Sequence, residues 1–209
     1  KHKMFLFLDA ASPIPEFHLI EDKKIIKSIK IIEDSDKKLS NSIIPKYLEI
    51  NSIYNLNSNI KKLIVTIGPG SYTALRVGAS FISGLSQSLS LPVSVVSTET
   101  IYDCFNDNKE IGIYFESSNN QKFFSYKKGL VFSHEKIENE NYILPKSISS
   151  IFYNLKNPKF NDEKIYLKAF SIKEIILKNI ELLEFKKNLI IKPIYISNNS
   201  ILNWKLSVN

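Results

Sequence analysis

The chain has 209 residues, a formal net charge of +7 and 44% hydrophobic residues, enough for one large domain or two small lobes with apolar cores. Its single cysteine, Cys104, excludes an internal disulfide framework and fits a reducing cytoplasm. No apolar run approaches the roughly 20 residues of a membrane helix, so we expect a soluble cytoplasmic protein without a membrane segment. Met4 is the only methionine and precedes the first apolar run, so residues 1–3 are interpreted as additions to the native sequence.

The first hundred residues predict an α/β lobe. Residues 5–8 form a short apolar strand that ends at Asp9, and residues 16–20 and 25–32 complete a three-stranded meander. Apolar residues at three- and four-residue steps predict a helix over 39–50, with Pro45 at its start or at a kink. A nearly continuous apolar run over 60–67 predicts a buried strand, followed by a helix from residue 71 or 73 to about 90 and a strand over 93–96. This βαβ unit beside the meander predicts a mixed sheet.

The second half reads as a smaller α/β lobe. Polar clusters at 106–110 and 117–121 separate predicted strands over 110–115 and 122–126. A helix over 146–155, a strand over 164–167, a helix over 171–183 and an extended segment over 193–196 follow. We therefore divide the chain into an N-terminal lobe, 1–100, and a second lobe, 101–209. No repeat of solenoid length occurs, although two similar lobes could conceal an old duplication.

The basic excess suggests nucleic-acid binding, since clustered Lys and Arg are typical of phosphate-binding surfaces. The lysines here are scattered among Ile, Asn and Ser along the whole chain. That pattern favours a general compositional bias, and a tRNA-binding surface is the weaker alternative.

The most informative stretch is residues 68–78, which read GPGSYTALRVG. Only six glycines occur in the chain, and four of them lie in or just after this stretch, at Gly68, Gly70, Gly78 and Gly84. A glycine-rich turn between a strand and a helix can bind an anion through backbone N–H groups. The stretch nevertheless lacks the Gly-Lys-Ser/Thr end of a Walker A loop and the third glycine of the dinucleotide fingerprint.

Small residues also form two stripes on the predicted helix. Ala74 and Gly78 make one, and Ser80, Gly84 and Ser88 make the other. Such stripes either pack on the chain's own sheet or admit a partner helix, and the sequence leaves both options open. The only arginine, Arg76, lies in the same segment, and its planar guanidinium suits holding carboxylates or carbonyls in fixed geometry.

Residues 68–78, with the continuation SFISGLSQSLSLPVSVVST, closely resemble the G-P-G-S-F-T-G-L-R-I-G segment of the TsaB (YeaZ) family, which has a glycoprotease-like (Gcp-like) domain. Weaker likenesses are Phe7-Leu8-Asp9, Ser40 with Ile43-Ile44-Pro45, and Pro193-Ile194-Tyr195-Ile196. The chain departs from the family at Ala10 (usually Thr), Tyr72 (Phe), Ala74 (Gly) and Leu39 (often His), and its second lobe shows no clear family motif.

The resemblance implies an α/β, actin-like (ASKHA, ribonuclease H-like), two-lobed fold with mixed central sheets. It implies a non-catalytic subunit that supports the enzyme TsaD, alongside the ATPase TsaE, in attaching threonylcarbamoyl to the adenosine adjacent to the tRNA anticodon. ATP and metal would then belong to the partner subunits, and tRNA would be reached only through the complex. The same two helices that bind TsaD would form the alternative homodimer.

Carried onto this chain, the resemblance places the partner interface on helices 39–50 and 73–90. The implied interface residues are Ser40, Ile43, Ile44, Tyr47, Thr73, Ala74, Arg76, Val77, Gly78, Phe81, Gly84 and Leu85. The loop motif preceding them consists of Gly68, Pro69, Gly70 and Ser71.

The rival hypothesis is an active actin-fold ATPase or phosphotransferase that uses Asp9, Ser12 and the loop 68–71. A strand-end aspartate more often caps its own loop, which weakens this rival. His2, His18 and His134 are isolated in the sequence, without the paired histidines of a metal-binding helix. Neither Ser71 nor Ser97 has a recognisable base. We therefore expect no catalytic residue and no metal ligand.

Overall fold

The computed structural model describes residues 4–33, 37–105, 110–138, 142–156, 158, 160 and 165–196. The interpretations of residues 1–3, of His2, and of the polar residues at 106–109 and after 196 lie outside this part of the chain. Every helix within it is too short or too polar to span a bilayer.

The first sheet contains β1 (Met4–Asp9), β2 (Glu16–Glu21), β3 (Lys24–Lys30), β4 (Ile60–Gly68) and β5 (Val93–Ser97), in the order β3-β2-β1-β4-β5. β1, β2 and β3 pair antiparallel, whereas β1, β4 and β5 pair parallel. Asp22 and Lys23 have φ of 47° and 61°, the left-handed backbone of a two-residue hairpin turn. The predicted meander and βαβ unit are confirmed.

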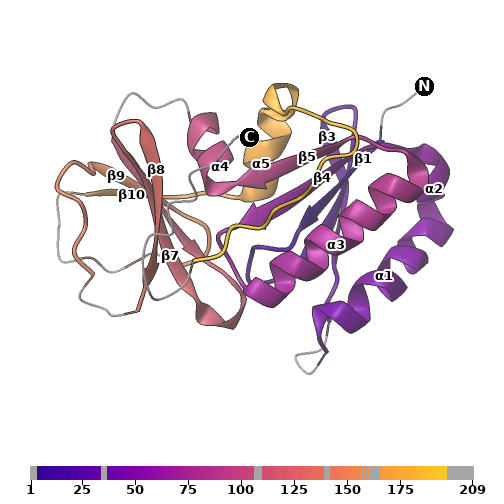
Figure 1. The fold of residues 1–209 in the computed structure, drawn as a ribbon, viewed down its shortest axis with the longest axis horizontal. Helices are drawn as coiled ribbons and strands as arrows, with labels where there is room; N and C mark the ends of the chain where they lie inside the picture. The colour runs from indigo at the N-terminus through magenta and orange to yellow at the C-terminus, as the bar shows by residue number, and fades with distance from the viewer. Residues whose placement is uncertain are drawn as a thin grey trace, which may run out of the picture.

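Three helices pack on one face of this sheet: α1 (Leu39–Tyr54), α2 (Leu56–Asn59) and α3 (Tyr72–Leu89). Strand residues that point to this face, such as Leu6 and Val65, share an apolar cluster with Ile43 and Ile82 of the helices. Figure 1 shows α1 beside α3 on the outer side of the molecule. Pro45 lies inside α1 rather than at its start.

The opposite face of the first sheet contacts α4 (Thr98–Cys104), α5 (Ile172–Lys178) and the 3₁₀ turn η2 (Ile180–Leu182). Figure 1 shows α4 and α5 between the two sheets. α4 was not predicted. The predicted helix over 171–183 is α-helical only to Lys178, after which the chain forms η2.

The second sheet contains β6 (Ile111–Glu116), β7 (Lys122–Lys128), β8 (Val131–Ile137), β9 (Ser150–Tyr153) and β10 (Tyr166–Ala169), with the 3₁₀ turn η1 (Ser118–Asn120) between β6 and β7. Its order is β10-β9-β6-β7-β8, so a three-stranded antiparallel meander is followed by two parallel strands. The first sheet has the same order and the same strand directions. This repetition supports the suspected duplication, and the expected actin-like, ribonuclease H-like α/β fold with two mixed sheets is confirmed.

The predicted helix over 146–155 is wrong, because β9 occupies its centre. β9 pairs parallel with β6 on one side and with β10 on the other. Ile151 and Phe152 point to opposite faces of the sheet, and both are buried. Ladder hydrogen bonds on both edges and burial on both faces favour the strand over a helix.

The C-terminal segment returns to the first sheet. Val93 and Lys186 exchange two backbone hydrogen bonds of 2.9 Å, and the Ile194 N–H donates to the Ile67 carbonyl at 2.8 Å. One apolar cluster also joins Phe7 of the first sheet, Ile176 of α5 and Phe115 of the second sheet. The division at residue 101 stays a prediction, since residues from both sides of it share this core.

Candidate functional site

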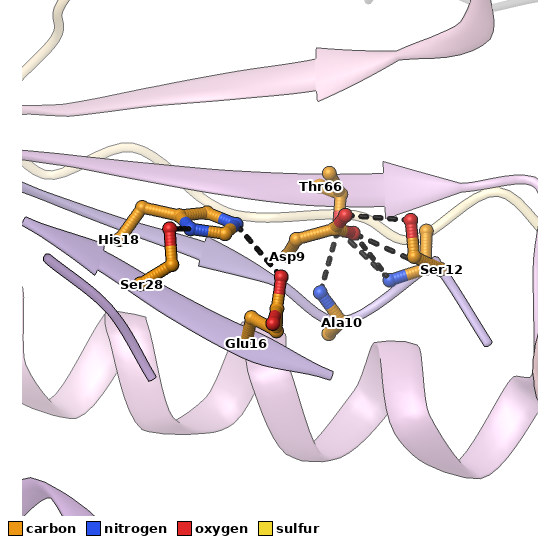
Figure 2. Close-up of polar contacts among 8 residues, drawn as sticks. Asp9, Ala10, Ser12, Glu16, His18, Ser28 and Thr66 are labelled. Atoms are coloured by element: carbon orange, nitrogen blue, oxygen red, sulfur yellow. Dashed lines mark hydrogen bonds and ion pairs between the residues drawn. The ribbon is translucent and has the colours of Figure 1, made fainter. Parts of the chain in front are cut away.

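The loop after β1 is organised around the buried carboxylate of Asp9, which lies beside the end of β4 (Figure 2). Its Oδ1 accepts hydrogen bonds from the backbone N–H groups of Ala11 (3.2 Å) and Ser12 (3.1 Å) and from the Thr66 hydroxyl (3.2 Å). Its Oδ2 accepts the Ser12 hydroxyl at 2.6 Å. Burial raises the pKa of Asp9, while the hydrogen bonds from Ser12, Ala11 and Thr66 act in the opposite direction.

Thr66 completes this network from the neighbouring strand. Its Oγ1 accepts hydrogen bonds from the backbone N–H groups of Ala10 (2.8 Å) and Ala11 (3.0 Å). The hydroxyl therefore satisfies two buried donors of the loop while donating to Asp9. Asp9 and Ser12, the predicted nucleotide-loop residues, thus bond within their own loop, as a loop-capping aspartate does.

The glycines of the loop motif make close contacts within the chain. Gly68 has φ of +105° and precedes a cis bond to Pro69. A Cβ on Gly68 would lie 2.8 Å from Leu75 Cδ1 and 3.1 Å from the Ile194 carbonyl oxygen, and one on Gly70 would lie 3.4 Å from the Ala11 carbonyl oxygen. Ser71 precedes α3 and is buried, with no side-chain cap hydrogen bond. The loop is packed against its neighbours, and its suggested role in binding a nucleotide stays a prediction.

The two small-residue stripes of α3 face different surroundings. A Cβ on Gly78 would lie 2.8 Å from Ala10 Cβ and 3.4 Å from Leu8 Cδ2, so the Ala74 and Gly78 stripe packs on the sheet. Gly84 has nothing within 4 Å of its Cβ position. Ser80 and Ser88 are exposed as well. Of the two stripes, only the one through Gly84 is open to a partner.

A groove of about 510 Å³ lies between α1 and α3. It is lined by Ser40, Ile43, Ile44, Tyr72, Thr73, Arg76, Val77, Ser80 and Phe81, which include most of the predicted interface residues. Below this α1–α3 groove, Tyr47 is buried, with its ring centroid 5.3 Å from that of Phe81. Leu85 is partly buried against the same core. Ile44 and Leu48, one helical turn apart on α1, are 56% and 57% exposed.

Arg76 lies on the wall of the groove among aromatic rings. Its Nη1 donates to the Tyr72 hydroxyl at 3.1 Å, and the guanidinium carbon is 5.2 Å from the Tyr72 ring centroid. The Tyr72 ring in turn contacts that of Tyr195, with centroids 4.5 Å apart. No carboxylate of the described residues lies within 4.0 Å of the guanidinium. Neither Tyr72 nor Tyr195 was a predicted site residue, although the family resemblance over residues 193–196 included Tyr195.

Of the two histidines in the described part of the chain, His18 is buried in the first sheet and His134 is partly buried in the second. His18 Nδ1 is 2.9 Å from Ser28 Oγ, and its Nε2 is 3.8 Å from Glu16 Oε2 (Figure 2). His134 Nδ1 is 2.9 Å from the buried Ser125 Oγ. Burial lowers the pKa of each histidine to about 4.

Potential metal ligands do not gather in the part of the chain that is described, where no three His, Cys, Asp or Glu side chains come together. Ser97, one of the two serines considered, caps α4 through a reciprocal pair of hydrogen bonds with Thr100. The expectations of no catalytic residue and no resident metal stay predictions.

Comparison with known proteins identifies the family. A family model described as "TsaD: tRNA N6-adenosine threonylcarbamoyltransferase" matches residues 32–153, which include α1 and the GPGSYTALRVG segment. The solved structure "YeaZ from Pseudomonas aeruginosa" superposes with a TM-score of 0.59 at 14% identity, covering 93% of this chain and 100% of that one. A second structure, described as an uncharacterized protein with similarity to peptidase YEAZ from Pseudomonas aeruginosa, has the same TM-score and coverage at 13% identity. No curated protein matches the chain. Because the family model spans more than half of the sequence, the chain belongs to the TsaD (Gcp-like) domain family, which confirms the resemblance found in the sequence.

Proposed function

We propose that this chain is a TsaB-type, non-catalytic subunit that binds TsaD and supports it in attaching threonylcarbamoyl to the adenosine beside the tRNA anticodon. The family match and the YeaZ-like fold support a role in this tRNA modification. In this proposal, ATP and metal reside in TsaD and TsaE, and tRNA contacts the chain only within the complex.

The α1–α3 groove is the observation that carries the proposal. Two exposed apolar side chains, Ile44 and Tyr72, line it, and each is more than half exposed. Leu48, one turn after Ile44 on α1, is exposed to a similar extent. The guanidinium of Arg76 adds a multi-donor group without a carboxylate partner among the described residues. Aromatic rings and arginine beside apolar residues are typical of the energetic centre of an interface. We infer that a TsaD helix packs along this groove and presents a carboxylate or backbone carbonyls to Arg76.

Gly84→Leu tests whether the exposed stripe of α3 through Gly84 contacts TsaD. The substitution should not disturb the core, because nothing lies within 4 Å of the Cβ position. Leucine is also a better helix former than glycine. We expect the variant to remain folded while its side chain blocks close approach of a partner helix. Lys178→Leu is the matched control, since it places a leucine at an exposed position of α5.

The assay is gel filtration and calorimetry with TsaD from the same organism. Wild type and Lys178→Leu should bind, and Gly84→Leu should not. Arg76→Lys keeps the charge but loses the planar fork, so it should weaken binding by about tenfold. A wild-type chain that never binds TsaD would contradict the proposal. If the free chain is a dimer that Gly84→Leu dissociates, the same surface also forms the homodimer.

The ATPase alternative is less well supported by the geometry of Asp9. Its carboxylate already accepts four hydrogen bonds from its own loop and Thr66. Turnover of ATP by the isolated chain, abolished in Asp9→Asn, would favour that alternative over ours.

A further inference from the structure

A second hollow, of about 470 Å³, lies at the opposite end of β1 from Asp9. We call it the Lys62 hollow. It lies between the start of β1, the β2–β3 turn, β4 and η2, and is lined by Phe5, Ile20, Asp22, Lys23, Lys62, Ile180, Glu181 and Leu183. It shares no lining residue with the α1–α3 groove. A ligand here would therefore not compete directly with a partner at that groove.

The hollow is lined by four apolar and four charged residues, and its volume suits a small molecule. Ile20, Ile180 and Leu183 contribute to it and are 1%, 7% and 9% exposed. The ring of Phe5 continues the apolar surface and lies 5.8 Å from the ring of Phe185, centroid to centroid. Small-molecule sites in proteins are mostly apolar, with a few polar groups that fix the ligand's orientation.

Lys62 is the polar group that distinguishes this hollow. Its Nζ lies 4.1 Å from the Phe185 ring centroid and 5.4 Å from that of Phe5. No carboxylate of the described residues lies within 4.0 Å of this ammonium. Ring faces attract the cation but accept hydrogen bonds poorly, so its three N–H donors are available to an anion.

The other lysine of the lining is already paired. Lys23 Nζ forms a salt bridge with Glu181 at the rim, where both side chains are mostly exposed. The Lys23–Glu181 pair neutralises its own charges, and Asp22, the remaining acidic residue of the lining, has an interaction of its own. Lys62 is therefore the charged group of the lining with which an anion can pair.

We propose that the Lys62 hollow binds a small amphipathic anion. The ligand's flat apolar body rests on Phe5 and on the exposed edges of Ile180 and Leu183, and its single carboxylate, sulfonate or phosphate group accepts hydrogen bonds from Lys62. This inference does not depend on the proposed role with TsaD.

Titration with 8-anilinonaphthalene-1-sulfonate tests the proposal, because this probe combines a flat aromatic body with one sulfonate. Lys62→Met keeps an unbranched apolar side chain and removes the charge. Lys61→Met is the matched control, since the neighbouring Lys61 is exposed and donates to the Ser58 carbonyl. We expect Lys62→Met to raise the Kd of the probe by about tenfold or more, and Lys61→Met by less than about twofold. The uncharged analogue N-phenyl-1-naphthylamine should bind both variants equally.

Amide chemical-shift mapping on the wild-type chain locates the probe without any variant. Shifts concentrated at Phe5, Lys62 and Leu183 would support the proposal. Absence of saturable binding, equal weakening by the two methionine variants, or shifts confined to Thr73, Val77 and the rest of the α1–α3 groove would each overturn it.

Discussion

Replacing Gly78 by alanine should push α3 away from the sheet. The new methyl carbon would lie 2.8 Å from Ala10 Cβ and 3.4 Å from Leu8 Cδ2. Carbon atoms pack best at about 3.5–4.0 Å, so the helix or the Ala10 loop must move by about 0.7 Å or more. Overpacking of this kind lowers the free energy of unfolding by about 1–3 kcal/mol.

Gly84→Ala in the same helix is the internal reference. Nothing lies within 4 Å of its Cβ position, and alanine favours a helix over glycine by about 1 kcal/mol. Both substitutions share this gain, so the difference between the two variants isolates the steric contact. We expect Gly84→Ala to be up to about 1 kcal/mol more stable than wild type, and Gly78→Ala to be about 1–3 kcal/mol less stable than Gly84→Ala.

Urea unfolding followed by circular dichroism measures both variants. Ala10→Gly removes the methyl group that Gly78→Ala meets, so the double variant should recover part of the loss, and a double-mutant cycle quantifies the coupling. Equal stability of Gly78→Ala and Gly84→Ala would refute the contact between Gly78 and the sheet, and with it the assignment of the two stripes.

Two further predictions concern buried polar groups. Thr66→Val leaves the Ala10 N–H group without its acceptor and the Ala11 N–H group with only Asp9 Oδ1, and it should lower the free energy of unfolding by about 1–3 kcal/mol in the same urea assay. His18 and His134 have a pKa of about 4 in the folded chain against an ordinary 6.5. Between pH 4 and 6.5 the unfolded chain therefore binds more protons than the folded chain. The stability contributed by the neutral imidazoles is complete above pH 6.5 and is lost as the pH falls toward 4. Between pH 7.5 and 5 each histidine should account for roughly 2 kcal/mol. The raised pKa of Asp9 changes the stability with pH in the opposite direction. The free energy of unfolding of His134→Gln is therefore compared with that of wild type at both pH values. If the substitution left the pH dependence of stability unchanged, the neutral state of His134 in the folded chain would be contradicted.

Local patterns were sufficient to predict the first sheet and its two long helices, α1 and α3. The apolar run of β4, the turn at Asp22 and Lys23, and the helical spacing of α3 each encode their structure within a few residues. The second sheet was less predictable because its pairings are long-range. Ile148, Ile151, Phe152 and Leu155 have helical spacing, and only β6 and β10 on either side make this segment a strand.

The candidate site was also predictable only where a local sequence pattern determines it. The sequence placed Arg76 and the small-residue stripes on one helix but left the orientation of the stripes open. Gly78 lies three residues after Leu75 and four before Ile82, both fully buried, so its inward position was encoded in the apolar periodicity. The contact between Tyr72 and Tyr195 joins segments far apart in the chain, and no local pattern indicates it.

The return of the C-terminal segment to the first sheet has a consequence for synthesis on the ribosome. The first sheet is translated early, yet Phe7, Ile20 and Ile64 are buried partly by α5, which emerges after the whole second sheet. Until then part of one face of the nascent sheet is exposed to solvent or to chaperones. Cotranslational folding of the first sheet is therefore completed only after α5 has emerged, and a fragment ending after β5 would expose an aggregation-prone apolar face.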